Sequence, residues 1–525
     1  MKKSTIFMLV LLMSFGKILG AEWVVRYDDP VNSSNATPYE GSLQYALLNF
    51  NAADTIKFAP AMAGKTIFFE TAWELKKGNL TIDASELASK VIFDASGKAT
   101  TPINNILCFF SSAPNNVDPT TSLVIKNIVF QNLIVSSTTN AEVGCINSKY
   151  GSLHVENCDF IDNKLFGPAS ASGSFSQGAI IASVTKNNLT VKNCRFINNR
   201  GRKGACITFW PMAMTVVENC YFSNNSTLSG GACIYSVPSS TTKGGESTAI
   251  IRNNVITQNS GNQYGSLILS EAPVTGQYMQ LYNNTMVGNT NTLTNTAQIP
   301  FIATKFRKMV LAGNLFAGNY NQDPTPTFNN EIGFAASMSA VLPEDSLVLI
   351  GYNIFSSPRN YGTPITQAKL DATHNVKYTE WADKPLVKPV IDGMMIPTDN
   401  DSLYSLYVKV IPSASLTWLG ATPLDQRGVP RTDSYVCIGA YEDARAPVTS
   451  TKKVRGTNAV SAWILGNTMH ISTAAKQVDI ISLSGQHVRK AANVSAFSLE
   501  GMSKGVYLVK VLDNDGVISN IKFKY

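Results

Sequence analysis

Acidic and basic side chains gather in two consecutive segments of this 525-residue chain, and they are its best candidates for chemistry. The first segment holds two carboxylates and the second holds four cations: Asp159 and Asp162, then Arg195, Arg200, Arg202 and Lys203. Such groups on one surface could bind a charged ligand or transfer protons. They could equally be solvated loop charges, since no three acids fall in register. Three aromatic residues nearby offer either a stacking surface for a ligand or ordinary packing: Trp210, Tyr221 and Tyr235.

The motifs of common catalytic centres are missing from the sequence. It contains no HExxH, GxSxG, P-loop or CxxC, and its four histidines are scattered. The run Asp513-Asn514-Asp515-Gly516 begins like a calcium loop but lacks the remaining ligands, so we predict a hairpin turn there. The run Asp399-Asn400-Asp401 is predicted to be a turn as well. We therefore predict no catalytic residue and no metal ligand from motifs.

One pattern, repeated seven times, must position these side chains. The copies read IKNIVFQNL, VENCDFIDN, VKNCRFINN, VENCYFSNN, IRNNVITQN, LYNNTMVGN and LAGNLFAGN. Their aligned third position is Asn127, Asn157, Asn193, Asn219, Asn253, Asn283 and Gly313, at spacings of 30, 36, 26, 34, 30 and 30 residues. A second asparagine ends six copies, at Asn163, Asn199, Asn225, Asn259, Asn289 and Asn319. Repetition at this period indicates a stacked architecture.

Each period consists of short strands. Apolar residues alternate with polar ones in every copy, and a Gly-rich motif between copies begins at Gly144, Gly178, Gly204, Gly231 and Gly265. With no helical segment between the strands, each period fits one coil of a β-solenoid. Equivalent residues then stack in columns at the inter-strand distance. Asparagine suits the turn columns because it tolerates left-handed backbone and bonds to nearby main chain.

The residue before the first asparagine column alternates in charge. It is Lys126, Glu156, Lys192, Glu218 and Arg252 in five successive copies. Opposite charges across neighbouring strands stabilise a sheet, and like charges destabilise it. We interpret this series as a structural ladder rather than a functional patch.

Most of the eight cysteines also fall in columns. Cys158, Cys194 and Cys220 share one column, and Cys206 and Cys233 share another. Stacked neighbours could form disulfides or remain buried thiols, and we favour thiols. Catalytic thiols are disfavoured, because the nearest histidine, His154, should point to solvent between inward residues.

The chain divides into four parts. Residues 1–21 have the charged start, apolar stretch and small residues of a signal peptide, and no later segment is apolar enough to span a membrane. Residues 22–445 form the solenoid, with a predicted helix at 41–48, strands at 55–58, 65–69, 80–82 and 91–93, coils to about residue 355 and an irregular closing segment. A Thr/Ser/Lys-rich linker, 446–459, precedes a strand-rich unit, 460–525, with strands predicted at 478–482, 506–511 and 518–523.

The net charge of +7 does not indicate nucleic-acid binding. Residues 1–21 contribute +3 and residues 446–525 contribute +6, which leaves −2 for residues 22–445. The basic balance thus belongs to the predicted signal peptide, linker and terminal unit. A near-neutral solenoid lacks the field that steers nucleic acids, so we expect no nucleic-acid partner.

The repeats resemble those of polymorphic outer-membrane proteins. The resemblance is carried by Gly230-Gly231-Ala232-Cys233-Ile234 and by Phe-x-x-Asn at Phe160, Phe196 and Phe222. Those proteins are right-handed parallel β-helices of the pectin-lyase-like superfamily. The segments 41–46 and 54–58 are similar to the cap and first coil of such proteins. Segments 425–431 and 438–442 look like their closing segment, except that Cys437 stands where an Asp is usual.

The last unit resembles the C-terminal sorting domain of the type IX (Por) secretion system of Bacteroidetes. The matching stretches are 479–486, 499–504 and Gly505-Val506-Tyr507-Leu508-Val509-Lys510-Val511. The resemblance implies an all-β chain whose small C-terminal β-sandwich engages the secretion machinery. It also implies passage through the periplasm to the outer cell surface or the medium.

Three functions follow as hypotheses from these resemblances, of which the third is a purely structural surface-layer component. The first is an adhesin-like β-helix that binds glycan or cell-surface ligands without catalysis, through residues among Asp159, Asp162, Arg195, Arg200, Arg202, Lys203, Trp210 and Tyr235. The second is a polysaccharide lyase or hydrolase acting on acidic polysaccharide. In lyases of this fold, acids hold Ca²⁺ and an Arg or Lys acts as base, so only this second hypothesis implies a cofactor, Ca²⁺. We favour the first, because fold alone does not establish activity.

Overall fold

The computed structural model of the chain describes residues 20–32, 37–75, 79–96, 108–112, 122–136, 142–148, 151–166, 176–177, 181–183, 188–209, 214–228, 230–237, 247–262, 265–270, 277–292, 299–304, 308–321, 329–334, 347–355, 359–360, 363–364, 366–377, 390–391, 394–395, 410–419, 424–426, 429–440, 462–465, 467–482, 486–503, 505–513 and 518–525. The predicted signal peptide, apart from its last two residues, and the predicted linker lie outside these ranges. So do the predicted Asp399–Asp401 turn and Trp210. The described residues form two compact units, which divide near residue 442.

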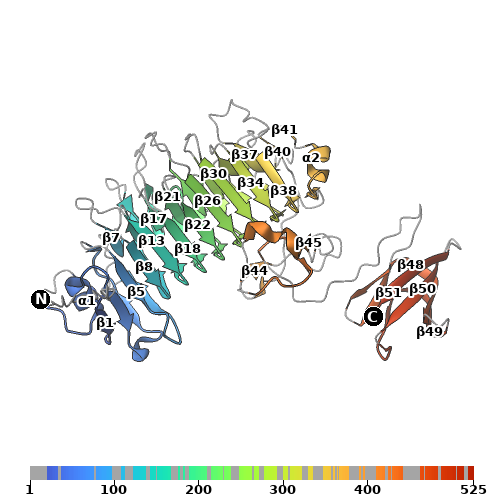
Figure 1. The fold of residues 1–525 in the computed structure, drawn as a ribbon, viewed down its shortest axis with the longest axis horizontal. Helices are drawn as coiled ribbons and strands as arrows, with labels where there is room; N and C mark the ends of the chain where they lie inside the picture. Colours follow the sequence, from blue (N-terminus) through green and yellow to red (C-terminus); the bar gives the residue numbers. More distant parts are fainter. Residues whose placement is uncertain are drawn as a thin grey trace, which may run out of the picture. The chain divides into compact units, whose positions relative to one another are not determined.

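The first unit is the predicted parallel β-helix. Its strands form four parallel sheets that run along the stack of coils, and one coil visits sheets 1, 2, 3 and 4 in turn (Figure 1). Sheet 1 consists of β1 (Glu22–Val25), β2 (Thr55–Phe58), β5 (Leu80–Asp83), β8 (Ser122–Lys126), β13 (Ser152–Glu156), β18 (Leu189–Lys192), β22 (Thr215–Glu218), β26 (Ser247–Arg252), β30 (Gln277–Tyr282), β34 (Lys308–Ala312) and β38 (Leu347–Gly351).

The other sheets repeat the same coil order. Sheet 2 consists of β3 (Thr66–Phe68), β6 (Val91–Asp94), β9 (Ile128–Gln131), β14 (Asp159–Ile161), β19 (Arg195–Ile197), β23 (Tyr221–Ser223), β27 (Val255–Thr257), β31 (Thr285–Val287), β35 (Leu315–Ala317), β39 (Ile354–Phe355) and β42 (Val376–Lys377). Sheet 3 consists of β10 (Ile134–Ser136), β15 (Lys164–Phe166), β20 (Arg200–Gly201), β24 (Ser226–Thr227), β28 (Ser260–Gly261), β32 (Thr290–Asn291) and β36 (Tyr320–Asn321). Sheet 4 consists of β4 (Trp73–Leu75), β7 (Phe110–Ser112), β12 (Ile146–Ser148), β17 (Ile181–Ser183), β21 (Ile207–Phe209), β25 (Ile234–Ser236), β29 (Ile268–Ser270), β33 (Ile299–Thr304) and β37 (Asn329–Phe334).

Helix α1 (Leu43–Asn49) lies at the N-terminal end of the stack, as the sequence predicts (Figure 1). Ser42 caps it by accepting a hydrogen bond from the Tyr45 amide at 3.2 Å, which satisfies one free donor of the first turn. Its apolar face is buried through Leu43, Ala46 and Leu47. Helix α2 (Gln367–Asp371) lies near the other end, and the stack continues one strand past the predicted limit of residue 355, to β42.

The interior is a stack of equivalent apolar side chains. Phe130, Phe160, Phe196 and Phe222 lie in successive strands of sheet 2 and are fully buried. Their ring centroids are 5.1, 4.9 and 4.8 Å apart with interplanar angles below 10°. This spacing equals the separation of neighbouring strands, so the coil repeat itself sets the ring stacking.

The first asparagine column is the left-handed turn between sheets 1 and 2. Asn127, Asn157, Asn193, Asn219, Asn253 and Asn283 have φ between 49° and 61°, and Gly313 has φ of 64°. Asparagine and glycine are the residues that adopt this backbone at least cost. The prediction for this column is confirmed.

The second asparagine column has a different role from the first. These side chains are buried, and the left-handed residue is the one before each of them, as at Asn224 with φ of 55°. The Asn225 amide groups show the pattern: backbone N–H and Nδ2 both donate to Asn259 Oδ1 at 2.9 Å, and Nδ2 also donates to the Phe196 carbonyl at 2.8 Å. In turn Asn225 Oδ1 accepts from the N–H and Nδ2 of Asn199, both at 3.0 Å. The column is therefore a continuous internal hydrogen-bonded ladder, from Asn163 to Asn319.

The column that holds three cysteines becomes a second such ladder. Below Cys158, Cys194 and Cys220 it continues as Asn254, Asn284, Asn314, Asn353 and Asn375. The Cys220 N–H donates to Asn254 Oδ1 at 2.9 Å, and its thiol lies 3.3 Å from the Glu218 carbonyl. The thiol takes the position of the asparagine Nδ2 on later coils, where Asn314 Nδ2, for example, donates to the carbonyl of Ala312, two residues earlier.

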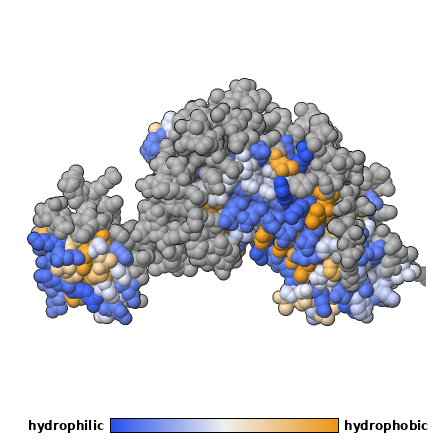
Figure 2. Space-filling view, turned by 180° about the vertical axis from the view of Figure 1, so that it is seen from behind, coloured by the Kyte–Doolittle hydropathy of each residue, from blue (hydrophilic) through white to orange (hydrophobic). Residues whose placement is uncertain are grey.

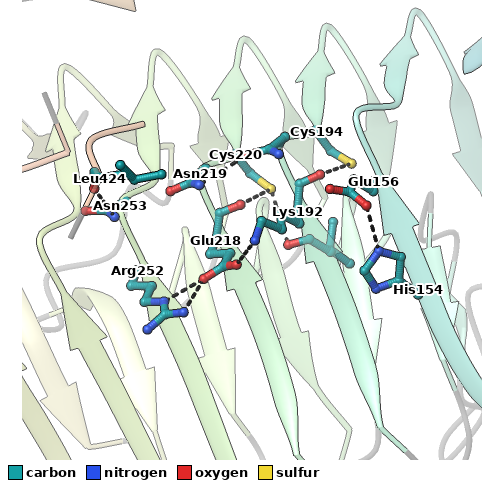
Figure 3. A network of polar contacts seen from close by, with 12 residues as sticks. His154, Glu156, Lys192, Cys194, Glu218, Asn219, Cys220, Arg252, Asn253 and Leu424 are labelled. Carbon is teal, nitrogen blue, oxygen red and sulfur yellow. Dashed lines mark hydrogen bonds and ion pairs between the residues drawn. The ribbon is translucent and has the colours of Figure 1, made fainter. Parts of the chain in front are cut away.

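The charged column on sheet 1 is the predicted structural ladder. Lys126 Nζ lies 3.8 Å from Glu156 Oε2. Glu218 lies 2.9 Å from Lys192 and 2.5 Å from Arg252 (Figure 3). The strand register adds two residues to the N-terminal end of this charged column, Lys57 of β2 and Asp83 of β5, which the sequence analysis did not include. His154 lies two residues before Glu156 on β13 and is partly exposed, with Nε2 3.1 Å from Glu156 Oε2.

The closing segment lies along the flank of the stack and includes η5 (Ser413–Leu419), β45 (Ile411–Pro412) and β46 (Tyr435–Val436) (Figure 1). Trp418 Nε1 donates to Asn283 Oδ1 at 2.7 Å, and Asn253 Nδ2 donates to the Leu424 carbonyl at 2.7 Å. These contacts join residues 135 and 171 positions apart. The segment thus covers the turns between sheets 1 and 2 in the C-terminal coils.

Residues 425–431 of the closing segment are hydrogen-bonded to residues 437–439 through Arg431. The fully buried Asp425 carboxylate accepts from the Val429 N–H at 2.9 Å. Arg431, only 2% exposed, donates to the carbonyls of Cys437 and Gly439 at 3.0 and 2.6 Å. The Gly439 N–H in turn donates to the Gly313 carbonyl at 2.7 Å, which fastens the segment to the solenoid.

The second unit is an antiparallel β structure. In the described residues it forms one hydrogen-bonded sheet of β47 (Ala462–Leu465), β48 (Thr468–Ser482), β49 (His487–Ser498), β50 (Val506–Asp513) and β51 (Ile518–Lys524). Its core includes Val478, Ile480, Val509 and Val511. Strands β50 and β51 pair antiparallel, as the predicted hairpin at 513–516 requires, although residues 514–517 lie outside the described ranges.

In the part of the chain that the structure describes, no helix has the length and apolarity needed to cross a membrane.

Candidate functional site

Asp159 and Arg195 are direct neighbours on sheet 2. They pair in register on β14 and β19, and Arg195 Nη1 lies 4.0 Å from Asp159 Oδ2. Lys90 approaches from the other side, with Nζ 2.9 Å from Asp159 Oδ1. Asp159 is 7% exposed and is therefore enclosed by two cations rather than open to a ligand. Lys90 reaches it across the intervening strand β9.

Asp162 stands at the left-handed turn between sheets 2 and 3. Its φ is 57°, and its carboxylate accepts a hydrogen bond from Asn198 Nδ2, which occupies the same turn on the next coil. Asp159, on the preceding strand, has different partners, Lys90 and Arg195. The two predicted acids therefore do not form one carboxylate pair.

Arg200 begins sheet 3 on its coil. Strand β20 pairs with β15 so that Arg200 lies opposite Lys164, and both side chains are exposed. The Arg200 N–H donates to the Asn163 carbonyl at 2.8 Å, which ties the start of β20 to the buried asparagine ladder. Lys164 and Arg200 each follow an asparagine of the buried ladder, so the ladder fixes where their side chains project from sheet 3.

Arg202 and Lys203 occupy the turn that follows β20. The Arg202 carbonyl accepts from Thr227 Oγ1 at 2.6 Å on the next coil. Lys203 Nζ lies 4.9 Å from the centroid of the Tyr235 ring, a cation–π geometry. Tyr235 itself is 4% exposed, so it supports Lys203 and leaves little ring surface for stacking.

The other two predicted aromatic residues, Tyr221 and Trp210, add little stacking surface in the described part of the chain. Tyr221 is 8% exposed and packs with Val255 and Ala440 beneath the closing segment. Trp210 lies outside the described residues. The described aromatic candidates are therefore packed, while the exposed candidates are cations.

All eight cysteines are free and buried. Burial raises the pKa of the Cys158 and Cys194 thiols well above the usual range. Cys194 raises the pKa of Cys158 further and Cys220 raises that of Cys194, whereas the hydrogen bond with Cys158 acts to lower the pKa of Cys194. Burial likewise raises the pKa of Cys206 and Cys233. Protonated, enclosed thiols are poor nucleophiles, which agrees with a packing role.

Nothing in the described ranges forms a group of three or more His, Cys, Asp or Glu side chains that could hold a metal ion. Asp159 is already paired with Lys90, and Asp162 is turned towards Asn198. Divalent calcium takes six to eight oxygen ligands. The described candidates therefore do not fit the Ca²⁺ that the lyase hypothesis implies.

The outer surface of the solenoid is mainly polar where it can be followed. Seen from the side opposite to Figure 1, its described residues form a hydrophilic band with separate apolar patches (Figure 2). A charged or hydroxylated ligand suits such a surface better than an apolar one.

Two important residues were missed by sequence reasoning. Lys90 lies 69 positions from Asp159, and no pattern in its own segment marks it. Lys164 could have been found, because it follows Asn163 as Arg200 follows Asn199. Alignment of the copies one position beyond the second asparagine would have placed the two cations together.

Comparison with known proteins assigns neither a family nor a function to the chain. No family model matches the chain, and no curated protein matches it. The crystal structure of Jun a 1, the major allergen from cedar pollen, matches 74% of this chain and 87% of its own, at 10% sequence identity and a TM-score of 0.24. The assignment of a parallel β-helix therefore rests on the strand register of the chain itself.

Proposed function

We propose that the protein is a secreted or surface-attached β-helix that binds glycan or other cell-surface ligands without catalysis. One observation carries this proposal: the two candidate acids are engaged in structural contacts, while the candidate cations Arg195 and Arg200 are exposed on the outer surface. Asp159 is paired with Lys90 and Arg195, and Asp162 accepts a hydrogen bond from Asn198, so both candidate acids already have structural partners.

The long parallel sheets support an extended ligand. Equivalent residues recur at every coil, about 4.8 Å apart, so a chain-like ligand meets the same sheet repeatedly along the stack. Solenoids commonly offer such extended surfaces to their partners. The binding free energies of many such weak contacts add together, so an extended ligand needs no deep cavity.

Export by a type IX secretion system is the second part of the proposal. It is supported by the resemblance of residues 479–511 to a sorting domain and by the separate antiparallel unit that contains them. The predicted signal peptide at 1–21 would direct the chain to the periplasm first. Deletion of residues 460–525 in a type IX-competent bacterium should leave the protein in the periplasm, and unchanged surface display would contradict this route.

The alternative is a lyase acting on acidic polysaccharide. The pairing of a carboxylate with Arg195 is the one observation in its favour, since Arg serves as base in such enzymes. Incubation of the full chain with uronic-acid polysaccharides, with and without Ca²⁺, separates the two functions. Binding without unsaturated product supports the proposal, whereas turnover that is abolished by Arg200→Ala or Arg202→Ala refutes it.

A further inference from the structure

A buried carboxylate, that of Asp54, holds the start of the solenoid. Asp54 is 3% exposed, and its Oδ1 accepts a hydrogen bond from the Ala21 N–H at 2.7 Å. Its Oδ2 accepts from Trp23 Nε1 at 2.8 Å and from the Asn51 N–H at 2.7 Å. Trp23 belongs to β1, and Asn51 lies in the turn between α1 and β2. One carboxylate therefore fastens the first strand to the turn that follows the capping helix.

Ala21 already belongs to the solenoid. Its carbonyl accepts from the Thr55 N–H at 2.9 Å, which adds to the parallel pairing of β1 with β2. Loss of Ala21 would remove both this bond and the one to Asp54. Gly20 lies so close to the same turn that a Cβ on it would be 1.8 Å from the Ala53 carbonyl oxygen. The well-bonded structure thus begins at Ala21, and residue 20 has no room for a side chain.

The turn that presents Asp54 contains a strained residue. Ala53 has φ of 72°, a left-handed conformation that residues other than glycine and asparagine seldom adopt. The Asp54 N–H donates to the Asn51 carbonyl at 3.2 Å, while the Asp54 carboxylate accepts from the Asn51 N–H. Backbone strain persists where surrounding contacts over-determine it. Here those contacts hold a carboxylate against the Ala21 nitrogen.

Cleavage of the Gly20–Ala21 peptide bond would change the charge at this position. The oxygen of a water molecule goes to the Gly20 carbonyl carbon, which becomes a carboxylate. Both hydrogens of the water go to the Ala21 nitrogen, which becomes an ammonium. The positive charge then lies at the nitrogen that is 2.7 Å from Asp54 Oδ1. A charge-assisted hydrogen bond is roughly twice as strong as a neutral one.

We infer that a signal peptidase cleaves between Gly20 and Ala21, and that the new α-ammonium of Ala21 forms an ion pair with Asp54 that completes the N-terminal cap. This inference rests on the proposed export, which requires that the precursor is processed. The cleaved bond lies among the small residues of the predicted cleavage site, one residue earlier than the predicted end of the signal peptide. The precursor has only a neutral amide at Ala21, so its first strand is held less firmly than that of the processed chain.

The N-terminus of the exported protein is the first test. The full precursor is expressed in a type IX-competent bacterium, and mass spectrometry identifies the N-terminal peptide of the exported chain. We expect Ala21 to be its first residue. A start at any other residue would overturn the inference and leave the proposed export intact. A chain that keeps Met1 would contradict the signal peptide as well, and the proposed export route would fail with the inference.

A coupling measurement tests the ion pair itself. The processed chain is compared with the same chain acetylated at its α-amine, because acetylation removes the charge but keeps an N–H at the Ala21 nitrogen. Both forms are prepared for the wild type, for Asp54→Asn and for a matched control, Asp28→Asn, which removes an exposed acid of the same N-terminal segment. The readouts are the thermal midpoint and the hydrogen exchange of the Thr55 amide, which bonds to the Ala21 carbonyl.

Acetylation should lower the midpoint of the wild type and of the control, and should speed exchange of the Thr55 amide roughly tenfold. In Asp54→Asn it should change neither quantity, because the new side chain carries no charge. An equal effect in all three proteins would overturn the ion pair, and so would the absence of an effect in the wild type. The wild-type comparison remains decisive even if Asp54→Asn fails to fold.

Discussion

The buried asparagine ladder should be the most sensitive element of the fold, and Asn225→Ala tests it. Asn225 is fully buried in the middle of the ladder. Truncation removes its acceptor from the Asn199 N–H and Nδ2 and its donor from the Phe196 carbonyl. All of these groups lie in the interior, where water does not replace the lost partner.

The expected loss of stability follows from those contacts. A buried polar group left without a partner costs about 1–3 kcal/mol, and the Asn199 N–H and the Phe196 carbonyl are the two groups most affected, because Asn199 Nδ2 keeps the Phe160 carbonyl as an acceptor. Partial relaxation around the small cavity reduces the sum, so we expect a loss of about 3–5 kcal/mol. The control is Asn224→Gly at the adjacent left-handed position, where Asn224 is exposed and glycine fits the φ of 55°. We expect it to change stability by less than about 1 kcal/mol.

Two assays measure this difference. Urea unfolding followed by far-UV circular dichroism gives the change in free energy, and hydrogen exchange reports the Asn199 amide directly. In Asn225→Ala that amide should lose its protection, while amides of distant coils keep theirs. If Asn225→Ala and Asn224→Gly have the same small effect, the ladder does not stabilise the fold and the reasoning is wrong.

The remaining predictions concern the thiols, the charge ladder and the closing segment. Cys220→Asn should fold with a stability within about 1 kcal/mol of the wild type, because the column continues as asparagine at Asn254, whereas Cys220→Asp should be destabilised by several times that amount; urea midpoints compare them. Titration with an aromatic disulfide reagent at pH 8 should label few of the eight thiols before denaturation and all eight after it, since they are free and buried; a native disulfide would reduce the final number. Burial acts to raise the pKa of the Glu218 carboxyl, but Lys192 and Arg252 outweigh it, so the folded-state pKa lies below the usual value of 4.5. Its stabilisation is therefore present above the unfolded-state pKa and lost as pH falls through the folded-state pKa, and thermal midpoints between pH 7 and 3 should fall less steeply in Glu218→Gln than in the wild type. Arg431→Ala should release the closing segment, with faster proteolysis near residue 430 than in Arg431→Lys, because two carbonyls lose their donor.

Much of the fold could be predicted because the repeats are local and their period is regular. The alternation of apolar residues predicted strands, and the columns predicted which residues stack, including Phe160 on Phe196. The charge alternation along Lys126, Glu156 and Lys192 correctly indicated adjacent coils. Stacking converts a sequence offset directly into a spatial neighbour, so little further information was needed.

The candidate site was harder to predict, because some of its contacts join coils that are not adjacent and others depend on the backbone conformation at a turn. Lys90 reaches Asp159 across an intervening strand, so alignment of adjacent copies cannot reveal it. Asp162 sits two residues beyond the aromatic Phe160, yet the left-handed turn sends it to a different face. The closing segment was predicted only as irregular, since its contacts with Asn253 and Asn283 lie more than 130 residues away.

The asparagine ladders also give the coil stack a direction of growth. Each Asn amide N–H donates towards the following coil, as Asn199 does to Asn225 and Asn225 to Asn259. A partly folded stack therefore presents free donors at its C-terminal end, which act as a template for the next coil and equally for a foreign strand. At the last position, Asn375 directs Nδ2 to Thr373 Oγ1 at 2.5 Å, beside helix α2. The Asn375 N–H likewise donates to the Leu370 carbonyl at 3.0 Å, so this ladder ends on helix α2 of its own chain.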